Sequence, residues 1–323
     1  MAPRQVGKKL YFTCAALRPV HNERVMNRLA IALASIRREA AHGWGHALSW
    51  FYWRFVLRFL RKRWPHRPTP EAADLLRPIT VVIPAVDKDA DVLEHCLRSV
   101  RRFILQPITE LWIVCPESPR IQALAEAHRA RVMPEDAILP KPARELKTRG
   151  WVLQQFIKLN AAHHVPTPDY LVLDADTVFL RPQLFVRKSK TILRYSDQYE
   201  LLYNRSLELA FGTKRRFPVS FVTHHMMFNR ERVQALLTFL TERFKRPWWE
   251  AILHEVDKGH PISFAEYELY GHFILRDPKW RKSFQLEYWN GLDLDGADLA
   301  RFNTLRAEAN PRINSLSFHR HTQ

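Results

Sequence analysis

The sequence contains little glycine and little cysteine, and each shortage excludes a class of site. Its 323 residues include nine glycines and no Gly-rich loop, so it has neither the dinucleotide-binding fingerprint nor a phosphate-cradling P-loop. The three cysteines lack the spacing of metal ligands, and Cys96 and Cys115 lie in apolar stretches. Free buried thiols in a reducing compartment are the simplest interpretation.

Long apolar runs are absent as well. No stretch of about 18 uncharged apolar residues occurs, which argues against a transmembrane helix. The first 25 residues lack an uninterrupted apolar core, so we expect no secretory signal. With 46% hydrophobic and 26% charged residues the composition is typical of globular proteins, and the length allows one large domain or two smaller ones.

Positive charge is concentrated near the N-terminus. The net charge is +17, and residues 1–78 contain 15 Lys/Arg against 4 Asp/Glu, a net of +11 that leaves +6 for the rest. The stretch "WFYWRFVLRFLRKRW" (50–64) surrounds a helical stripe of basic residues with Trp and Phe: Arg54, Arg58, Arg61 and Lys62. Such a helix is typical of segments that lie on anionic lipid.

We therefore expect residues 1–64 to form a basic amphipathic helical extension that is peripheral on the inner, cytoplasmic face of the membrane. Packing of the same helix on the rest of the protein, with its arginines toward water, is the alternative. No nucleic-acid reading module accompanies the charge, so we expect no nucleic-acid partner. Residues 65–78 are Pro-rich and predict a connector.

Beyond the connector, strand and helix patterns alternate. "ITVVIPA" (79–85) and "ELWIVCP" (110–116) predict buried strands, and residues 89–103 and 150–164 predict helices. The alternation predicts one α/β domain over 79–323, with a mostly parallel sheet flanked by helices. Ligands of such sheets bind beyond the carboxyl ends of the strands.

The second half continues the pattern. "SFVT" predicts a strand that ends before His224 and His225, and a helix follows. "SFAEYELYGHFIL" predicts another helix, and "INSLSFHRHTQ" a last strand with His319 and His321 on one face.

A strand followed by "DADTV" presents two close carboxylates, Asp174 and Asp176, at a carboxyl end. They can simply end a strand and cap a turn. They can instead hold Mg²⁺ or Mn²⁺, hard ions that neutralise a departing diphosphate.

A third interpretation is a haloacid-dehalogenase-like phosphatase, which also has Asp-x-Asp-x-Thr after a strand. That motif usually follows the first core strand and needs a later acidic pair after another strand, whereas "DLDGAD" (293–298) follows no apolar strand, so we prefer glycosyl transfer.

Five segments follow one another between residues 78 and 321: "ITVVIPAVDKD", "GWVLQQFIKLNAA", "YLVLDADTVFL", "THHMMFNRE" and "FAEYELYG". Together they resemble a bacterial family of uncharacterised glycosyltransferase-like proteins, which is similar in turn to the GT-A fold nucleotide-sugar enzymes with an Asp-x-Asp motif. The resemblance implies a Rossmann-type, GT-A-like catalytic domain. It also implies that Asp174, Asp176 and His319 bind the metal, and that the base and ribose lie on Pro84, Ala85, Val86 and Asp87.

The helix over 150–164 adds a polar stripe. Trp151, Gln154, Gln155 and Lys158 fall at i, i+3, i+4 and i+7. We expect the two amides and the ammonium to face a nucleotide diphosphate, with Lys158 offsetting phosphate charge. A solvated polar face is the alternative.

An inverting transferase needs a base for the acceptor hydroxyl, whereas a retaining one need not have one. Glu266 and Glu268 lie among aromatic residues, where burial raises a carboxyl pKa and sugar rings can stack. We expect Glu266 to be the base and Glu268 its partner, with acceptor contacts from His224, His225, Tyr267 and Tyr270.

The sequence thus predicts a metal-dependent glycosyltransferase that moves a sugar from a nucleotide-diphosphate donor to a surface-polysaccharide or lipid-linked acceptor. The alternatives are the phosphatase and a catalytically inactive, membrane-attached binding protein.

Overall fold

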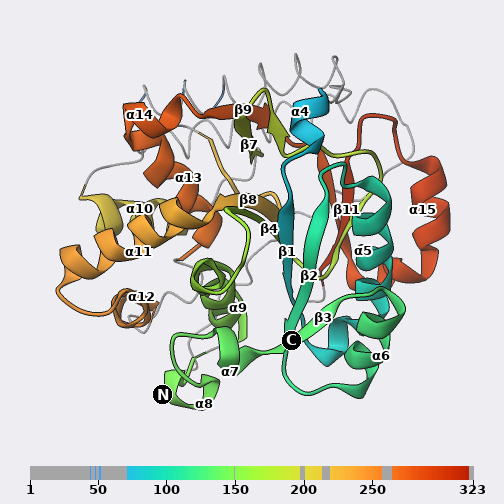
Figure 1. Ribbon diagram of the computed structural model, residues 1–323, viewed down its shortest axis with the longest axis horizontal. Helices are drawn as coiled ribbons and strands as arrows, with labels where there is room; N and C mark the ends of the chain where they lie inside the picture. Colours follow the sequence, from blue (N-terminus) through green and yellow to red (C-terminus); the bar gives the residue numbers. More distant parts are fainter. Residues whose placement is uncertain are drawn as a thin grey trace, which may run out of the picture.

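The computed structural model describes residues 71–148, 150–196, 201–212, 219–256 and 264–319, together with Trp44, Leu48 and Phe51 (Figure 1). The rest of the predicted extension, residues 65–70 of the predicted connector, and His321 lie outside the described residues. Among the described helices, none combines the length and the apolar character needed to cross a membrane.

A five-stranded sheet forms the centre of the protein, with the strand order β3-β2-β1-β4-β8. Four strands are parallel: β1 (Ile79–Pro84), β2 (Ile108–Cys115), β3 (Arg131–Pro134) and β4 (Asp169–Leu173). The edge strand β8 (His225–Asn229) is antiparallel to β4. The predicted α/β class with a mostly parallel sheet is confirmed.

Helices cover both faces of this sheet (Figure 1). One face carries α5 (Ala90–Phe103) and α6 (Pro119–Ala127), and the other carries α9 (Gly150–Asn160), α11 (Arg230–Phe244), α12 (Trp248–Val256) and α13 (Glu266–Arg276). Alternation along β1 explains the two layers. Val81 and Ile83 belong to the same buried cluster as Leu93 of α5, whereas Val82 belongs to the cluster of Phe156 in α9.

The helix ends follow local rules. Ser118 caps α6, where its Oγ accepts from the Ile121 N–H at 3.2 Å and Pro119 takes the first helical position. Asn229 caps α11 by accepting from the Arg232 N–H at 3.3 Å. Because β8 ends at the residue that caps α11, the chain turns directly from the sheet into the helix layer.

Two small sheets flank the central one. The first has the order β10-β11-β5 and consists of β5 (Thr177–Phe179), β10 (Gly291–Asp295) and β11 (Ser315–His319). The second has the order β6-β7-β9 and consists of β6 (Val186–Arg187), β7 (Lys190–Tyr195) and β9 (Phe284–Tyr288). The other α-helices of the described residues are α4 (Ala72–Leu75), α7 (Glu135–Ile138), α8 (Ala143–Leu146), α10 (Leu201–Phe211), α14 (Pro278–Arg281) and α15 (Phe302–Glu308).

One predicted strand position is wrong. The strand expected at "SFVT" begins only at His225, so His225 is the first residue of a strand and His224 comes directly before it. The "DLDGAD" segment was expected to follow no apolar strand. Its first three residues lie in β10, a half-exposed strand that pairs in parallel with β11. Both strands are short, and their pairing partners are distant in sequence.

These pairings bring distant residues to the end of β4. Leu173 pairs with His225 in the antiparallel register, so the Asp174 N–H donates to the His224 carbonyl at 2.9 Å. After "DADTV" the chain enters β5, which pairs with β11, and the Phe318 N–H donates to the Asp176 carbonyl at 3.0 Å. The next residue along β11 is His319. The topology therefore gathers β4, β8, β10 and β11 at one corner.

Helix α13 packs so closely at Gly271 that a methyl group cannot fit. A Cβ built at this glycine would lie 2.3 Å from Cδ2 of Phe221, which is itself fully buried. We expect Gly271→Ala to destabilise the protein by about 3 kcal/mol, because overpacking forces neighbours off their preferred rotamers. The free energy of unfolding in urea measures this loss.

Gly150→Ala is the matched control, since a Cβ at this position in α9 meets nothing within 4 Å. It should leave stability unchanged or raise it by up to about 1 kcal/mol. Equal stability of the Gly271→Ala and Gly150→Ala proteins would contradict the packing described for α13.

Candidate active site

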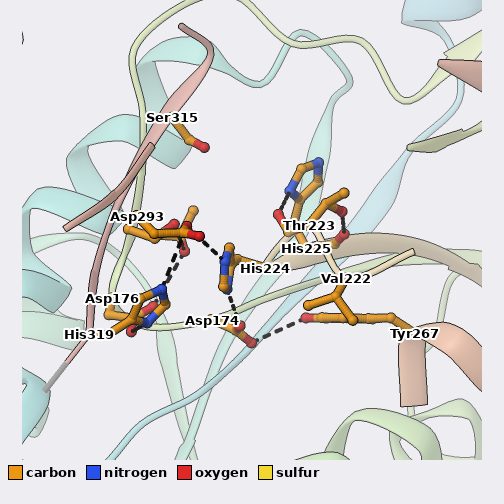
Figure 2. A network of polar contacts seen from close by, with 12 residues as sticks. Asp174, Asp176, Val222, Thr223, His224, His225, Tyr267, Asp293, Ser315 and His319 are labelled. Carbon is orange, nitrogen blue, oxygen red and sulfur yellow. Dashed lines mark hydrogen bonds and ion pairs between the residues drawn. The ribbon is translucent and has the colours of Figure 1, made fainter. Parts of the chain in front are cut away.

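Asp174 and Asp176 lie at the carboxyl edge of the central sheet, directly after β4 (Figure 2). Their side chains are one-quarter exposed, at 25% and 23%. Each carboxylate contacts a different histidine: His224 Nδ1 lies 3.3 Å from Asp174 Oδ2, and His319 Nδ1 lies 3.1 Å from Asp176 Oδ2. The strand end thus presents two acid–imidazole pairs side by side.

A third carboxylate joins the two pairs. Asp293 Oδ1 lies 3.2 Å from His224 Nε2 and 3.6 Å from His319 Nε2, so it faces the opposite nitrogen of each ring. The two rings are 4.8 Å apart between centroids. Figure 2 shows the three side chains pointing toward one another. The result is a chain of contacts in the order Asp174, His224, Asp293, His319, Asp176.

This arrangement shifts the pKa values of its members. Burial disfavours the charged form of His224, but hydrogen bonds with Asp174 and Asp293 outweigh it and raise the pKa of the ring to about 10. Burial likewise lowers the pKa of His319, but hydrogen bonds with Asp176 and Asp293 outweigh it and raise the pKa to about 9. Burial alone would raise the carboxyl pKa values of Asp174 and Asp293, yet the cationic groups around them hold both well below their usual range.

The backbone at His224 has an unusual conformation. Its φ of 61° lies in the left-handed region, which residues with a side chain adopt at a cost of about 1–3 kcal/mol. The conformation turns the His224 ring toward Asp174 and Asp293, while His225 points away, beside Thr223 (Figure 2). Strain of this kind clusters at functional sites, which supports a functional role for His224.

A second cluster lies on the other side of Asp174. Lys158 of α9 is buried and donates to Asp174 Oδ1 and, at 2.7 Å, to Glu266 Oε1. The Tyr267 hydroxyl donates to the same Asp174 oxygen at 3.1 Å, and Lys158 Nζ lies 4.5 Å from the centre of the Tyr267 ring. The Glu266 N–H donates to Gln155 Oε1 at 3.1 Å. Asp174 is therefore fixed through both of its oxygens.

Opposing effects set the pKa values in this cluster. Burial lowers the pKa of Lys158, but Asp174 and Glu266 outweigh it and hold the pKa well above its usual value. Burial raises the pKa of Glu266, and Lys158 offsets that rise only in part. The two carboxylates therefore favour the charged form of Lys158, and Lys158 in turn favours the charged form of Glu266, which burial disfavours.

The structure brings half of the predicted site residues to this corner. They are Asp174, Asp176, His224, His319, Lys158, Gln155, Glu266 and Tyr267. The residues Pro84, Ala85, Val86 and Asp87 lie at the carboxyl end of β1, the strand next to β4. There Asp87 Oδ1 accepts from Ser118 Oγ at 2.6 Å. Gln154 is half-buried on α9. The predicted contacts of these residues with a nucleotide stay predictions.

Three predicted residues lie elsewhere. Glu268 is buried, and its Oε2 atom lies 3.1 Å from Nε2 of His272, one turn further along α13. The Tyr270 hydroxyl accepts from the Asn229 N–H, and Asn229 pairs with Asp169 at the opposite end of β4. His225 is buried against Phe179, Phe185 and Trp289. The acceptor contacts expected of these three residues are not supported, because their side chains point away from the corner.

Asp293 is the site residue that the sequence pattern did not identify. Its strand, "GLDLD", alternates leucine with glycine or aspartate, which is the period of a half-buried strand. That alternation indicates β10 and its exposed aspartates. The side-by-side position of Asp293 and His319 depends on the parallel pairing of β10 with β11, which the alternation does not reveal.

The side chains of this corner fit a divalent cation. One ligand atom from each of His224, Asp293 and His319 lies within 4.8 Å of the other two. Carboxylate oxygens suit Mg²⁺ and Mn²⁺, while imidazole nitrogens favour a transition metal, so Mn²⁺ satisfies both ligand types. Asp293 is 46% exposed, which leaves the cluster open to an entering ion.

Residues 77–298 match the model of a family described as "Family of unknown function (DUF6492)". The chain belongs to this family. The matched region includes Asp174, Asp176, His224 and Asp293 and ends before His319. No curated protein matches the chain in sequence.

Solved structures with a similar arrangement of elements are glycosyltransferases. The galactosyltransferase LgtC, in complex with donor and acceptor sugar analogues, is 12% identical with a TM-score of 0.44 over 74% of this chain and 87% of its own. Glucosyl-3-phosphoglycerate synthase from Mycobacterium tuberculosis, in complex with Mn²⁺, uridine diphosphate and phosphoglyceric acid, is 17% identical with a TM-score of 0.39 over 58% and 72%. Mouse xyloside xylosyltransferase 1 is 13% identical with a TM-score of 0.41 over 74% and 97%. Likeness at this level does not establish a reaction, which has to be inferred from the side chains.

Proposed function

We propose that this protein is a metal-dependent glycosyltransferase that uses a nucleotide-diphosphate sugar as donor. The observation that carries the proposal is the contact chain from Asp174 to Asp176 through His224, Asp293 and His319, at the carboxyl edge of a mostly parallel sheet. This edge is where such sheets bind nucleotides. A divalent cation bound there would neutralise the negative charge of a departing diphosphate.

The residues of the corner suit the binding steps of this reaction. The carboxyl end of β1, with Asp87, lies beside β4 and suits a base and ribose, so the diphosphate would extend toward Asp176 and His319. Lys158 fixes Asp174 and is itself buried, so it acts on the diphosphate only through Asp174 or after a rearrangement.

Glu266 lies beside the corner but is as buried as Lys158, so it too would reach a sugar only after a rearrangement. It lies 2.7 Å from Lys158 and beside Tyr267, which contacts Asp174. We propose Glu266 as the group that orients the sugar or accepts the proton of the acceptor hydroxyl. A carboxyl group whose pKa is raised by burial is suited to that task.

The reaction is tested with full-length protein and MnCl₂ against a panel of nucleotide sugars. The proposal predicts that at least one donor raises the melting temperature in the presence of Mn²⁺ and is slowly broken down, with release of the nucleoside diphosphate. Release of inorganic phosphate from a phosphomonoester without donor breakdown would favour the phosphatase. Absence of both activities and of any metal-dependent stabilisation would favour a binding protein.

The acceptor belongs to the same proposal, as a surface polysaccharide or a lipid-linked glycan at the cytoplasmic face of a membrane. Its support is the basic aromatic stretch at residues 50–64. We expect full-length protein to bind vesicles that contain anionic lipid, and replacement of four basic residues by glutamine to weaken binding at least about tenfold, since each contributes about 1 kcal/mol near such a surface. The four are Arg54, Arg58, Arg61 and Lys62. Vesicle co-sedimentation measures the effect.

The control replaces four exposed basic residues of the catalytic domain in the same way: Lys279, Arg281, Lys282 and Arg312. It removes the same net charge and should change vesicle binding much less. Equal losses in the two variants would show that net charge, and not the N-terminal stretch, directs the protein to lipid.

A further inference from the structure

We infer that Arg194 is a positioning residue for the site, and that it acts through His225 to hold His224 in place. Arg194 belongs to β7, and His225 is the first residue of β8. The inference rests on the proposed function only where it connects His224 to the reaction, because the position of His224 can be measured in a protein that is given no substrate.

Arg194 is a buried cation without a counter-charge. Its side chain belongs to a residue that is 4% exposed, and burial lowers its pKa only to about 10, so it stays charged at neutral pH. Glu287, which lies opposite Arg194 in the register of β9 and β7, forms its ion pair with Arg187. Within the part of the chain that the structure describes, Arg194 forms no ion pair and its Nε has no hydrogen-bond partner. A buried charge of this kind is costly, which points to a role beyond packing.

Two aromatic rings and two acceptors hold the guanidinium. Its Cζ lies 4.5 Å from the centre of the Phe185 ring and 4.7 Å from the centre of a Trp289 ring, a cation–π arrangement. Its Nη2 donates to the Leu184 carbonyl at 2.9 Å, and its Nη1 donates to His225 Nε2 at 3.4 Å. The group is therefore held from several sides, with one N–H pointing at His225.

The neighbours of His225 determine where its proton lies. Nδ1 of the ring is 2.7 Å from the Thr223 carbonyl, which can only accept, so Nδ1 carries the hydrogen. Arg194 can only donate, so Nε2 is the acceptor. A neutral ring in this one tautomer satisfies both neighbours at once. Arg194 thus holds the ring in the orientation that bonds to Thr223.

Thr223 and His225 form a clamp around His224 (Figure 2). The His225 ring donates to the Thr223 carbonyl, and the Thr223 hydroxyl donates to the His225 carbonyl at 2.8 Å. His224 lies between them with its φ of 61°. A left-handed conformation of this kind persists only where the surrounding structure imposes it. We attribute it to the two hydrogen bonds that span this single residue.

Trp289 allows the two sides of the site to be told apart. Its Nε1 donates to the Oγ of Ser315, the first residue of β11, at 3.1 Å, and its ring lies 4.3 Å from the His225 ring. Loss of the guanidinium leaves the hydrogen bond between Trp289 and Ser315 in place, whereas His225 loses its donor. The effect should therefore appear at His224 and not along β11.

The test is a crystal structure of the full-length Arg194→Met protein. Methionine fills much of the same volume but donates no hydrogen bond. We expect the fold and β11 to persist, while His224 leaves the left-handed region and loses the contact of its Nδ1 with Asp174 Oδ2, which is 3.3 Å in the wild type. His225→Phe removes the other partner of the same contact and should displace His224 in the same way. It also decides the question where Arg194→Met does not fold.

Arg187→Met is the matched control. Arg187 lies in the same small sheet, its side chain is 12% exposed, and its ion pair is with Glu287 at 3.5 Å. This variant removes the same charge and should leave His224 as it is in the wild type. An unchanged His224 in both Arg194→Met and His225→Phe, or an equal displacement in Arg187→Met, would overturn the inference.

Rates give a second readout, which depends on the proposed function. Arg194→Met should slow the breakdown of a nucleotide sugar about 10–100-fold, the usual effect of a misplaced site residue. The double variant with His224→Gln should be no slower than His224→Gln alone, since both changes act on one group. Effects that multiply would show a general structural role and count against positioning. A displaced His224 in a protein whose wild type breaks down no nucleotide sugar would support the positioning role and count against the proposed reaction.

Discussion

Replacement of His319 by alanine is expected to lower the Mn²⁺-dependent breakdown of a nucleotide sugar by about a thousandfold. A bound cation stabilises developing phosphate charge by several kcal/mol, and each 1.4 kcal/mol corresponds to about a factor of ten in rate. His319 contacts both Asp176 and Asp293, so its loss removes one proposed metal ligand and interrupts the contact chain. Release of the nucleoside diphosphate at saturating Mn²⁺ measures the effect.

The matched control is His164→Ala, which removes an exposed histidine that follows η3 (Ala161–His163) and precedes β4, whereas the corner lies at the other end of that strand. It should keep the wild-type rate. A folded His319→Ala protein with more than about one-tenth of the wild-type rate would argue against a metal-binding role for this residue.

The second large effect concerns stability and not rate. Lys158→Met should destabilise the protein by about 3–5 kcal/mol, because it leaves Asp174 and Glu266 without the buried cation that both contact. Methionine keeps much of the side-chain volume, so the loss reports on charge more than on packing. Urea unfolding at neutral pH measures the free energy of unfolding.

Two further variants identify the cause. Glu266→Gln keeps Lys158 paired with Asp174 and should lose at most about 2 kcal/mol. The double variant Lys158→Met with Glu266→Gln should be more stable than Lys158→Met alone, since one uncompensated carboxylate has been removed. Losses that simply add in the double variant would show that the two side chains do not interact.

Local patterns were sufficient to predict the central fold. The buried strand β1 and the helix α5, with acidic residues at its start and arginines at its end, follow from apolar periodicity and from the helix dipole. The same patterns located β4 and the carboxylates that follow it. Because a parallel sheet places its strand ends at one edge, those signals also predicted where the site lies.

The parts that the sequence did not reveal depend on pairing between distant segments. Asp293 reaches the site because β10 pairs with β11, and His224 because β8 runs antiparallel to β4. Neither strand is longer than five residues, and short strands give weak periodic signals. The residues of helix α13 that face the site were predicted only in part, for another reason. It is buried on nearly every side, so a helical stripe could not show that Glu266 and Tyr267 face Asp174 while Glu268 and Tyr270 do not.

The most direct measurement is a crystal structure of the full-length protein with Mn²⁺ and uridine diphosphate, with anomalous scattering used to locate manganese. Our account predicts one manganese peak beside Asp293 and His319, in contact with diphosphate oxygens at the edge of the sheet next to Asp176. A nucleotide bound with no manganese at this corner, and with Asp293 still bridging His224 and His319, would contradict it.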